Sequence, residues 1–167
     1  FVSQKQKRFM IKIFKFGGTS IKDAESIKRI TQILRKYANE NLVVVFSAMG
    51  KVTNMLEEVV EEYMNKSGNS ESKLQKVKDF HASILGELFE QNHTVYNEVN
   101  NLFVEIEWVL EDEPNPDFAF NYDQIVSVGE LLSTKIMSAY LQEKGVKIFW
   151  LDARDMIRTN NKYRNAK

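Results

Sequence analysis

Cysteine is absent from the 167 residues, which excludes disulfides, thiolate catalysis and cysteine-ligated zinc. His81 and His93 are the only histidines, so we predict no metal held by protein ligands. The 23 basic and 23 acidic side chains cancel, which argues against binding nucleic acid or a membrane surface through bulk charge. No apolar run approaches the about 20 residues of a membrane span. Residues 1–8 are polar and basic, unlike a signal peptide, so we expect a soluble cytoplasmic protein with a short N-terminal tail at 1–8.

The remaining composition is that of a globular α/β or α domain. Hydrophobic residues make up 43% of the chain and charged residues 28%, which excludes an intrinsically disordered protein. Short apolar runs at 10–16 and 42–46 predict strands, and helical spacing from Ile21 to Tyr37 predicts a helix between them. This order is a βαβ unit, so we predict a parallel sheet. The uninterrupted run 42–46 is typical of a strand covered on both faces.

Helices dominate the rest of the sequence. Apolar spacing predicts helices at 53–64 and 125–142, and two long amphipathic helices within about 73–113. No strand separates those two, so we expect an antiparallel hairpin and interpret it as a helical insertion in a domain that spans 9–167. Residues 146–151 predict a third strand. Three strands are few for so many helices, and we expect the fold to be truncated.

The clearest chemical pattern is Lys-Phe-Gly-Gly-Thr-Ser at residues 15–20, where the first predicted strand ends. Glycines let the backbone approach a ligand closely, and a helix N-terminus offers unpaired N–H groups and positive potential. Lys15 adds a mobile cation, so the pattern predicts a phosphate cradle; an ordinary glycine-rich turn, with Thr19 or Ser20 as helix cap, is the alternative. The spacings of the P-loop and of the dinucleotide-binding fingerprint do not occur.

Two further segments complete the candidate site. The turn at 47–54 follows the second strand, and both turns face the carboxyl edge of a parallel sheet, where ligands bind. Ser47 and Thr53 offer hydroxyl groups there, although Thr53 is alternatively a helix N-cap. The segment 127–134 places Glu130 among glycine and apolar residues. A buried carboxylate there needs a partner, which a substrate ammonium group would supply; an exposed helix glutamate is the alternative.

Together these segments resemble the aspartokinases, of the amino-acid kinase family. The pattern at 15–20 is similar to the family signature, and Ser-Ala-x-Gly-x-x-Thr-Asn at 47–54 to its second glycine turn. Val-Gly-Glu-Leu-Leu-Ser-Thr at 128–134 is similar to its substrate-glutamate segment, and 151–159 to the stretch after the next strand. The resemblance covers nearly the whole chain in the same order. It implies an α/β fold, a three-layer sandwich with a mainly parallel sheet, of which this chain is the N-terminal part.

The implied reaction is the ATP-dependent phosphorylation of the β-carboxylate of L-aspartate to 4-phospho-L-aspartate, the first step of lysine, threonine and methionine biosynthesis. The partners are L-aspartate and ATP, Mg²⁺ is bound with the nucleotide, and we expect the full-length protein to be a homo-oligomer. By this resemblance Lys15 is catalytic, because it neutralises charge on the transferring phosphoryl group. The residues implied to bind ATP or its phosphates are Lys15, Gly17, Gly18, Thr19 and Ser20. Those implied to bind aspartate are Ser47, Thr53 and Glu130.

The resemblance stops short of a complete catalytic site. In the family, the arginine that grips the substrate carboxylate, the aspartate that organises the phosphates and the adenine-binding loop lie further along the chain. No segment of this sequence matches them, so we expect the 167 residues alone to be inactive. Two alternatives stay open: another acyl-phosphate-forming amino-acid kinase with a different acid, and a non-catalytic binding module that retains the phosphate cradle.

Overall fold

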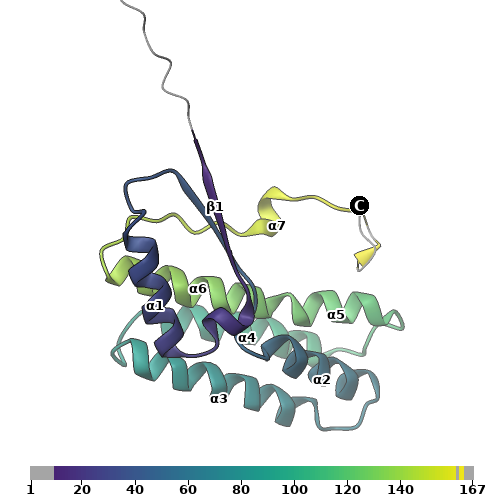
Figure 1. The fold of residues 1–167 in the computed structure, drawn as a ribbon. Helices are drawn as coiled ribbons and strands as arrows, with labels where there is room; N and C mark the ends of the chain where they lie inside the picture. The colour runs from purple at the N-terminus through teal and green to yellow at the C-terminus, as the bar shows by residue number, and fades with distance from the viewer. Residues whose placement is uncertain (1–9, 161, 164–167) are drawn as a thin grey trace, which may run out of the picture.

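The computed structural model describes residues 10–160 and 162–163, so the predicted tail lies outside the described residues. Two strands, β1 (Lys12–Phe16) and β2 (Leu42–Phe46), pair in parallel and in register along their whole length. The parallel sheet predicted from the βαβ order is therefore confirmed. Figure 1 shows the strands projecting from a layer of long helices, with α1 (Ala24–Arg35) beside them.

The two faces of this sheet differ in their cover. Side chains on one face pack against the helical core and are half-buried or buried: Phe14, Phe16, Leu42, Val44 and Phe46. On the other face, Ile13 is 70% exposed, and Val43 and Val45 are each 47% exposed. The prediction that the second strand is covered on both faces is wrong for the described residues. Of the three layers that the resemblance implies, this part of the chain supplies the sheet and one helical layer.

A short 3₁₀ turn, η1 (Gly18–Ile21), separates β1 from α1. The side chain of Asp23 caps α1, because it accepts a hydrogen bond from the N–H of Ser26 at 2.8 Å. The predicted cap, Thr19 or Ser20, is wrong, since the apolar spacing begins at Ile21, the last residue of η1, whereas α1 starts only at Ala24.

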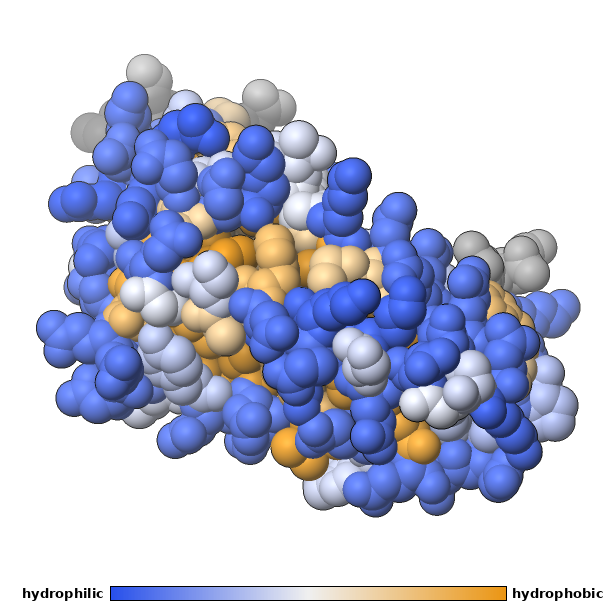
Figure 2. All heavy atoms as spheres, turned by 90° about the horizontal axis from the view of Figure 1, so that it is seen from below, coloured by the Kyte–Doolittle hydropathy of each residue, from blue (hydrophilic) through white to orange (hydrophobic). Residues whose placement is uncertain are grey.

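The helical layer begins with three consecutive elements: α2 (Val52–Met64), α3 (Ser70–Leu88) and α4 (Val95–Glu111). The Tyr63 hydroxyl joins α2 to the end of α4, because it donates to the backbone carbonyls of Val109 and Asp112 at 2.7 and 2.9 Å. An ion pair between Lys78 and Glu107 joins α3 to α4, although α3 packs chiefly on α2 and α4 on α6. Figure 2 shows hydrophilic side chains over most of the lower face of the molecule, with apolar surface between them.

Three more helices follow: α5 (Phe118–Val126), α6 (Val128–Glu143) and the short α7 (Ala153–Met156). The predicted single helix at 125–142 is wrong in its bounds, because α5 and α6 separate at Ser127. The Asp117 side chain starts α5 early by accepting a hydrogen bond from the N–H of Ala119 at 2.9 Å. Nine of the 16 residues of α6 are buried, so this helix passes through the centre of the core.

Residues 146–151 do not pair with the sheet in the described structure, so the predicted third strand is wrong. The alternation of buried and exposed side chains in this segment has another cause. Ile148 and Trp150 pack against the core, whereas Phe149 between them is 84% exposed. The Trp150 Nε1–H donates to the hydroxyl of Thr134 at 3.1 Å, and the Lys135 Nζ lies 3.7 Å from the centre of the indole ring. The segment is therefore anchored on α6 through one of its two faces.

A histidine side chain lies inside this core. His81 of α3 is fully buried between the rings of Phe80 and Phe103, at centroid distances of 5.3 and 5.6 Å. Its Nδ1 lies 2.8 Å from the carbonyl oxygen of Val77, and its Nε2 has no hydrogen-bond partner among the described residues. Burial lowers the pKa of His81 to about 4, against the opposing effect of the Val77 contact. The imidazole is therefore neutral at pH 7 in the folded chain.

We predict that the folded chain loses stability in mild acid through His81. The unfolded chain binds a proton at this residue near pH 6.5, and the folded chain binds it only near pH 4. The unfolded state therefore takes up more protons in this window, so stability is full above about pH 6.5 and falls toward pH 4. Urea unfolding at pH 7 and pH 5 should show a loss of about 2 kcal/mol from this residue.

The matched comparison is His81→Leu, which keeps every other titrating group. This variant should show a weaker pH dependence of the unfolding free energy than the unchanged chain. Equal pH dependence in the two proteins would contradict the assignment of this effect to His81.

Candidate active site

The two glycine turns lie side by side at the carboxyl ends of β1 and β2. The N–H of Ser47 donates to the carbonyl of Phe16 at 3.0 Å, one step beyond the paired strands. The N–H of Gly50 then donates to the carbonyl of Gly18, also at 3.0 Å. The structure thus brings the turn at 15–20 against the turn at 47–54, as the parallel sheet predicts.

Gly18 occupies a point of this junction where no side chain fits. A Cβ atom there would lie 2.5 Å from the carbonyl oxygen of Ala48 and 2.9 Å from that of Gly50. Both neighbours are backbone atoms, so they can give way only if the second turn moves. Gly50 meets a different constraint, because its φ of +52° lies in the left-handed region that glycine adopts without strain.

The third predicted segment reaches the same point from α6. A Cβ atom at Gly129 would lie 3.1 Å from Leu56, 3.2 Å from Ala48 and 3.3 Å from Val52. The helix therefore packs on the second turn and on α2 about as closely as a glycine permits. Ala48 lies next to both Gly18 and Gly129 by this measure, so all three predicted segments meet at this residue.

Glu130 lies in the first turn of α6, directly after this contact, and is half-buried. Burial raises the pKa of its carboxyl, and the backbone N–H groups of Glu130 and Ala48, which stabilise the charged form, act in the opposite direction. None of the ion pairs between described residues includes Glu130. The alternative of a fully exposed helix glutamate is wrong. The site instead holds a partly desolvated carboxylate with backbone donors beside it and no cation among the described residues.

Lys15 lies near the end of β1, on the uncovered side of the sheet. Its Nζ is 3.6 Å from where a Cβ atom of Gly17 would stand, so the ammonium group lies close to the glycine turn. Among the backbone hydrogen bonds that join turns and loops of the described residues, none has the N–H of Gly17 or Gly18 as its donor. Thr19 and Ser20 are exposed on η1. The predicted helix N-terminus is wrong in detail, because η1 rather than α1 follows the glycines.

The two remaining predicted residues lie next to the contact at Ala48. Ser47 is half-buried and precedes Ala48 in the second turn. Thr53 is half-buried in the first turn of α2, beside Val52, which contacts Gly129. The alternative of Thr53 as an N-cap is wrong, because Lys51 holds the cap position and provides no side-chain hydrogen bond.

One residue of this arrangement has no predicted role from the sequence. Ser133 of α6 is fully buried, and its hydroxyl lies 2.8 Å from the carbonyl oxygen of Ser47 and 2.9 Å from that of Glu130. A signal for it does exist in the sequence. Gly129 and Ser133 are small residues four positions apart, which places them on one face of a helix, where another backbone can approach closely.

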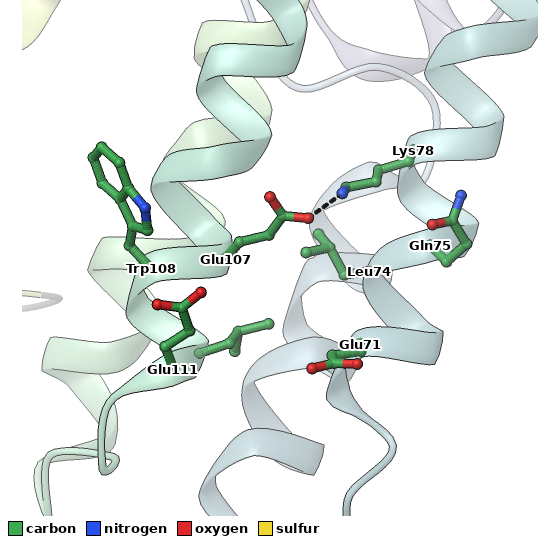
Figure 3. Close-up of a pocket in the computed structure, with 8 residues that line it drawn as sticks. Glu71, Leu74, Gln75, Lys78, Glu107, Trp108 and Glu111 are labelled. Carbon is green, nitrogen blue, oxygen red and sulfur yellow. Dashed lines mark hydrogen bonds and ion pairs between the residues drawn. The ribbon is translucent and has the colours of Figure 1, made fainter.

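Two hollows of the described structure lie away from these residues. One of about 460 Å³ opens between α3 and α4, and Figure 3 shows the Lys78–Glu107 ion pair across it, with Trp108 pointing away. No predicted site residue lines it. Among the described residues, no three His, Cys, Asp or Glu side chains form a group that could hold a metal ion. In the same part of the chain, no helix combines the length and the apolar character that crossing a membrane requires.

Known proteins resemble this chain over almost its full length. Residues 10–167 match the model of the amino acid kinase family. The chain is 31% identical over 156 residues to the lysine-sensitive aspartokinase 3 of Escherichia coli. The aligned region covers 93% of this chain and 34% of that protein. It is 32% identical over 147 residues to the chloroplastic aspartokinase 1 of Arabidopsis thaliana, with coverages of 84% and 25%. The chain thus spans about a third or less of the length of these relatives.

Solved structures agree with this relationship. E. coli aspartokinase III in complex with aspartate and ADP matches with a TM-score of 0.81 and 32% identity, over 95% of this chain and 34% of that chain. The aspartate kinase of Clostridium acetobutylicum, at 21% identity and a TM-score of 0.62, shares the fold. The fold class predicted from the resemblance is therefore confirmed. Since the family model matches all but the first nine residues, the chain belongs to the amino acid kinase family.

Proposed function

We propose that this chain is the N-terminal part of the catalytic domain of an aspartate kinase. The observation that carries the proposal is Glu130, a partly desolvated carboxylate with no ion-pair partner among the described residues, directly after Gly129, which packs against the same residue as the glycine turn of β1. Such a carboxylate is stabilised by an ammonium group, which an amino-acid substrate supplies. The likeness to an aspartokinase that holds aspartate and ADP supports the same assignment.

The reaction is an in-line phosphoryl transfer. A β-carboxylate oxygen of aspartate attacks the γ-phosphorus of ATP, a P–O bond forms, and the P–O bond to ADP breaks, which gives 4-phospho-L-aspartate and ADP. The nucleophile is already ionised at neutral pH, so no base is needed, and the chemistry depends on positioning and charge neutralisation. A chain with two histidines and no cysteine is therefore suited to it.

Each predicted residue has a part in this proposal. Lys15 neutralises charge on the phosphoryl group, and the N–H groups of Gly17 and Gly18 donate to its oxygens. Thr19 and Ser20 support that turn. The aspartate-binding groups are Ser47, Thr53 and Glu130, with Glu130 bound to the substrate ammonium group. Mg²⁺ enters with the phosphates of ATP, where it neutralises their charge.

The proposal extends to the protein that carries this chain. Since the chain spans about a third of its E. coli relative, we propose that the 167 residues do not catalyse the reaction without the remainder of the domain. The segment at about 73–113 is a helical insertion in that domain, the complete protein is a homo-oligomer, and its location is the cytoplasm. The following experiments use an intact kinase that contains this chain together with the rest of the catalytic domain.

Lys15→Ala should lower turnover by about 10²–10³-fold, because one preorganised donor to a developing oxyanion contributes about that much. The KM for aspartate should change less. Steady-state kinetics measure both, with Lys36→Ala, an exposed lysine just after α1, as the control. A loss of turnover below about tenfold would mean that Lys15 is a surface cation beside the turn.

Glu130→Gln should raise the KM for aspartate strongly and leave the KM for ATP nearly unchanged. The substitution keeps the shape but removes the charge, and the poorly paired ammonium group then costs several kcal/mol. Thr53→Val should act in the same direction by about 1–3 kcal/mol, because it leaves one hydrogen-bond partner unsatisfied.

The control for Glu130→Gln is Glu61→Gln, an exposed glutamate of α2. Thermal unfolding is measured on the same samples. If Glu130→Gln lowers only the unfolding temperature and leaves the KM for aspartate untouched, Glu130 is structural and the proposed substrate role is rejected.

A further inference from the structure

A single peptide group of the second turn is held by α6 through its carbonyl and carries an N–H that acts on the charge of Glu130. Its carbonyl, which belongs to Ser47, accepts a hydrogen bond from the buried hydroxyl of Ser133 at 2.8 Å. Its N–H, which belongs to Ala48, stabilises the charged form of Glu130. The carbonyl and N–H of a trans peptide point in opposite directions, so the hydrogen bond that holds the Ser47 carbonyl also sets the direction of the Ala48 N–H.

The contact with Ser133 is the one that holds the carbonyl side. Within the described part of the chain, no other hydrogen bond reaches the carbonyl oxygen of Ser47. The same hydroxyl also lies 2.9 Å from the carbonyl oxygen of Glu130, but that carbonyl is inside α6 and has a helical N–H donor as well. Loss of the Ser133 hydroxyl would therefore leave the Ser47 carbonyl without its donor.

The consequence for Glu130 is electrostatic. With the peptide in its observed orientation, the N–H of Ala48 favours the charged form of the Glu130 carboxylate. If the peptide rotated, the Ser47 carbonyl oxygen would turn toward the carboxylate, and two negative groups would repel each other. The packing of Gly129 against Ala48 fixes how far α6 stands from the turn, but a contact between carbon atoms does not fix the rotation of the peptide plane.

We propose that Ser133 is a positioning residue of the aspartate site. It holds the Ser47–Ala48 peptide so that its N–H supports the Glu130 carboxylate and the Ser47 side chain keeps its place, and it acts on substrate through these two residues. This inference rests on the proposed function, since it assigns Ser133 a role in binding aspartate.

A first test uses the 167-residue chain and needs no activity. In Ser133→Ala, amide hydrogen exchange at Ala48 should become about tenfold faster, a factor that matches the loss of one buried hydrogen bond. Amides in α3 should exchange at an unchanged rate. The matched control is Ser138→Ala, a half-buried serine on the same helix, which should leave Ala48 unaffected. Unchanged exchange at Ala48 in Ser133→Ala, or an equal acceleration throughout the chain, would overturn the proposal.

A second test uses the intact kinase and a double-mutant cycle. Ser133→Ala should raise the KM for aspartate about tenfold with little change in the KM for ATP or in turnover. In a Glu130→Gln background the same substitution should change the KM for aspartate by less than about threefold, because residues that act through one another are not additive. Ser138→Ala should have no effect in either background.

The outcomes separate this inference from the proposed function. If Glu130→Gln raises the KM for aspartate but Ser133→Ala does not, or if the two effects multiply fully, the positioning role fails and the proposed function stands. If Glu130→Gln has no effect on the KM for aspartate, the proposed function itself fails, and this inference fails with it.

Discussion

At Ala48 three stretches of chain approach one another so closely that Gly18 has no room for a side chain and Gly129 has little. A Cβ atom added at Gly18 would lie 2.5 Å from the carbonyl oxygen of Ala48. A Cβ atom added at Gly129 would lie 3.2 Å from the Cβ atom of Ala48. Because core packing is dense and hardly compressible, this contact fixes the end of β1, the turn after β2 and the start of α6 relative to one another. The remaining features of the candidate site follow from that fixed arrangement.

The arrangement suits a reaction that depends on position. Phosphoryl transfer to a carboxylate needs the acceptor, the phosphoryl group and the neutralising cation to be held in line, and needs little acid–base chemistry. The β1 turn carries Lys15 and backbone N–H groups for which the described part of the chain supplies no hydrogen-bond acceptor, and α6 carries the ammonium-binding candidate Glu130. Their separation is set by contacts between backbone atoms and small side chains, which have few alternative conformations. A site of this kind is therefore largely formed before substrate arrives.

Much of the fold and of the candidate site was predictable from local sequence patterns, and the predictions that failed did so for physical reasons. Strand, glycine turn and helix signals at the start of the chain are local, so the parallel pair and the meeting of its two turns follow from them. The predicted third strand at 146–151 failed because its alternation reflects anchoring by Trp150 on α6. The prediction that β2 is covered on both faces failed because the composition of a strand does not reveal which layers the chain itself contains. Ser133 was missed because its hydrogen bond to Ser47 joins residues 86 positions apart. Likewise, the reason for a glycine at position 129 is the close approach of Ala48, which is distant in the sequence.

The contact at Ala48 is tested most directly by the unfolding free energy of two glycine variants of the described chain. Gly86 of α3 is exposed, and a Cβ atom there meets nothing within 4 Å. Gly86→Ala should therefore stabilise the chain by about 0.5–1 kcal/mol through helix propensity. Gly18→Ala forces a methyl group against two backbone carbonyls and should destabilise the chain by about 1–3 kcal/mol, as overpacking does. A neutral or stabilising Gly18→Ala beside a stabilising Gly86→Ala would contradict the account.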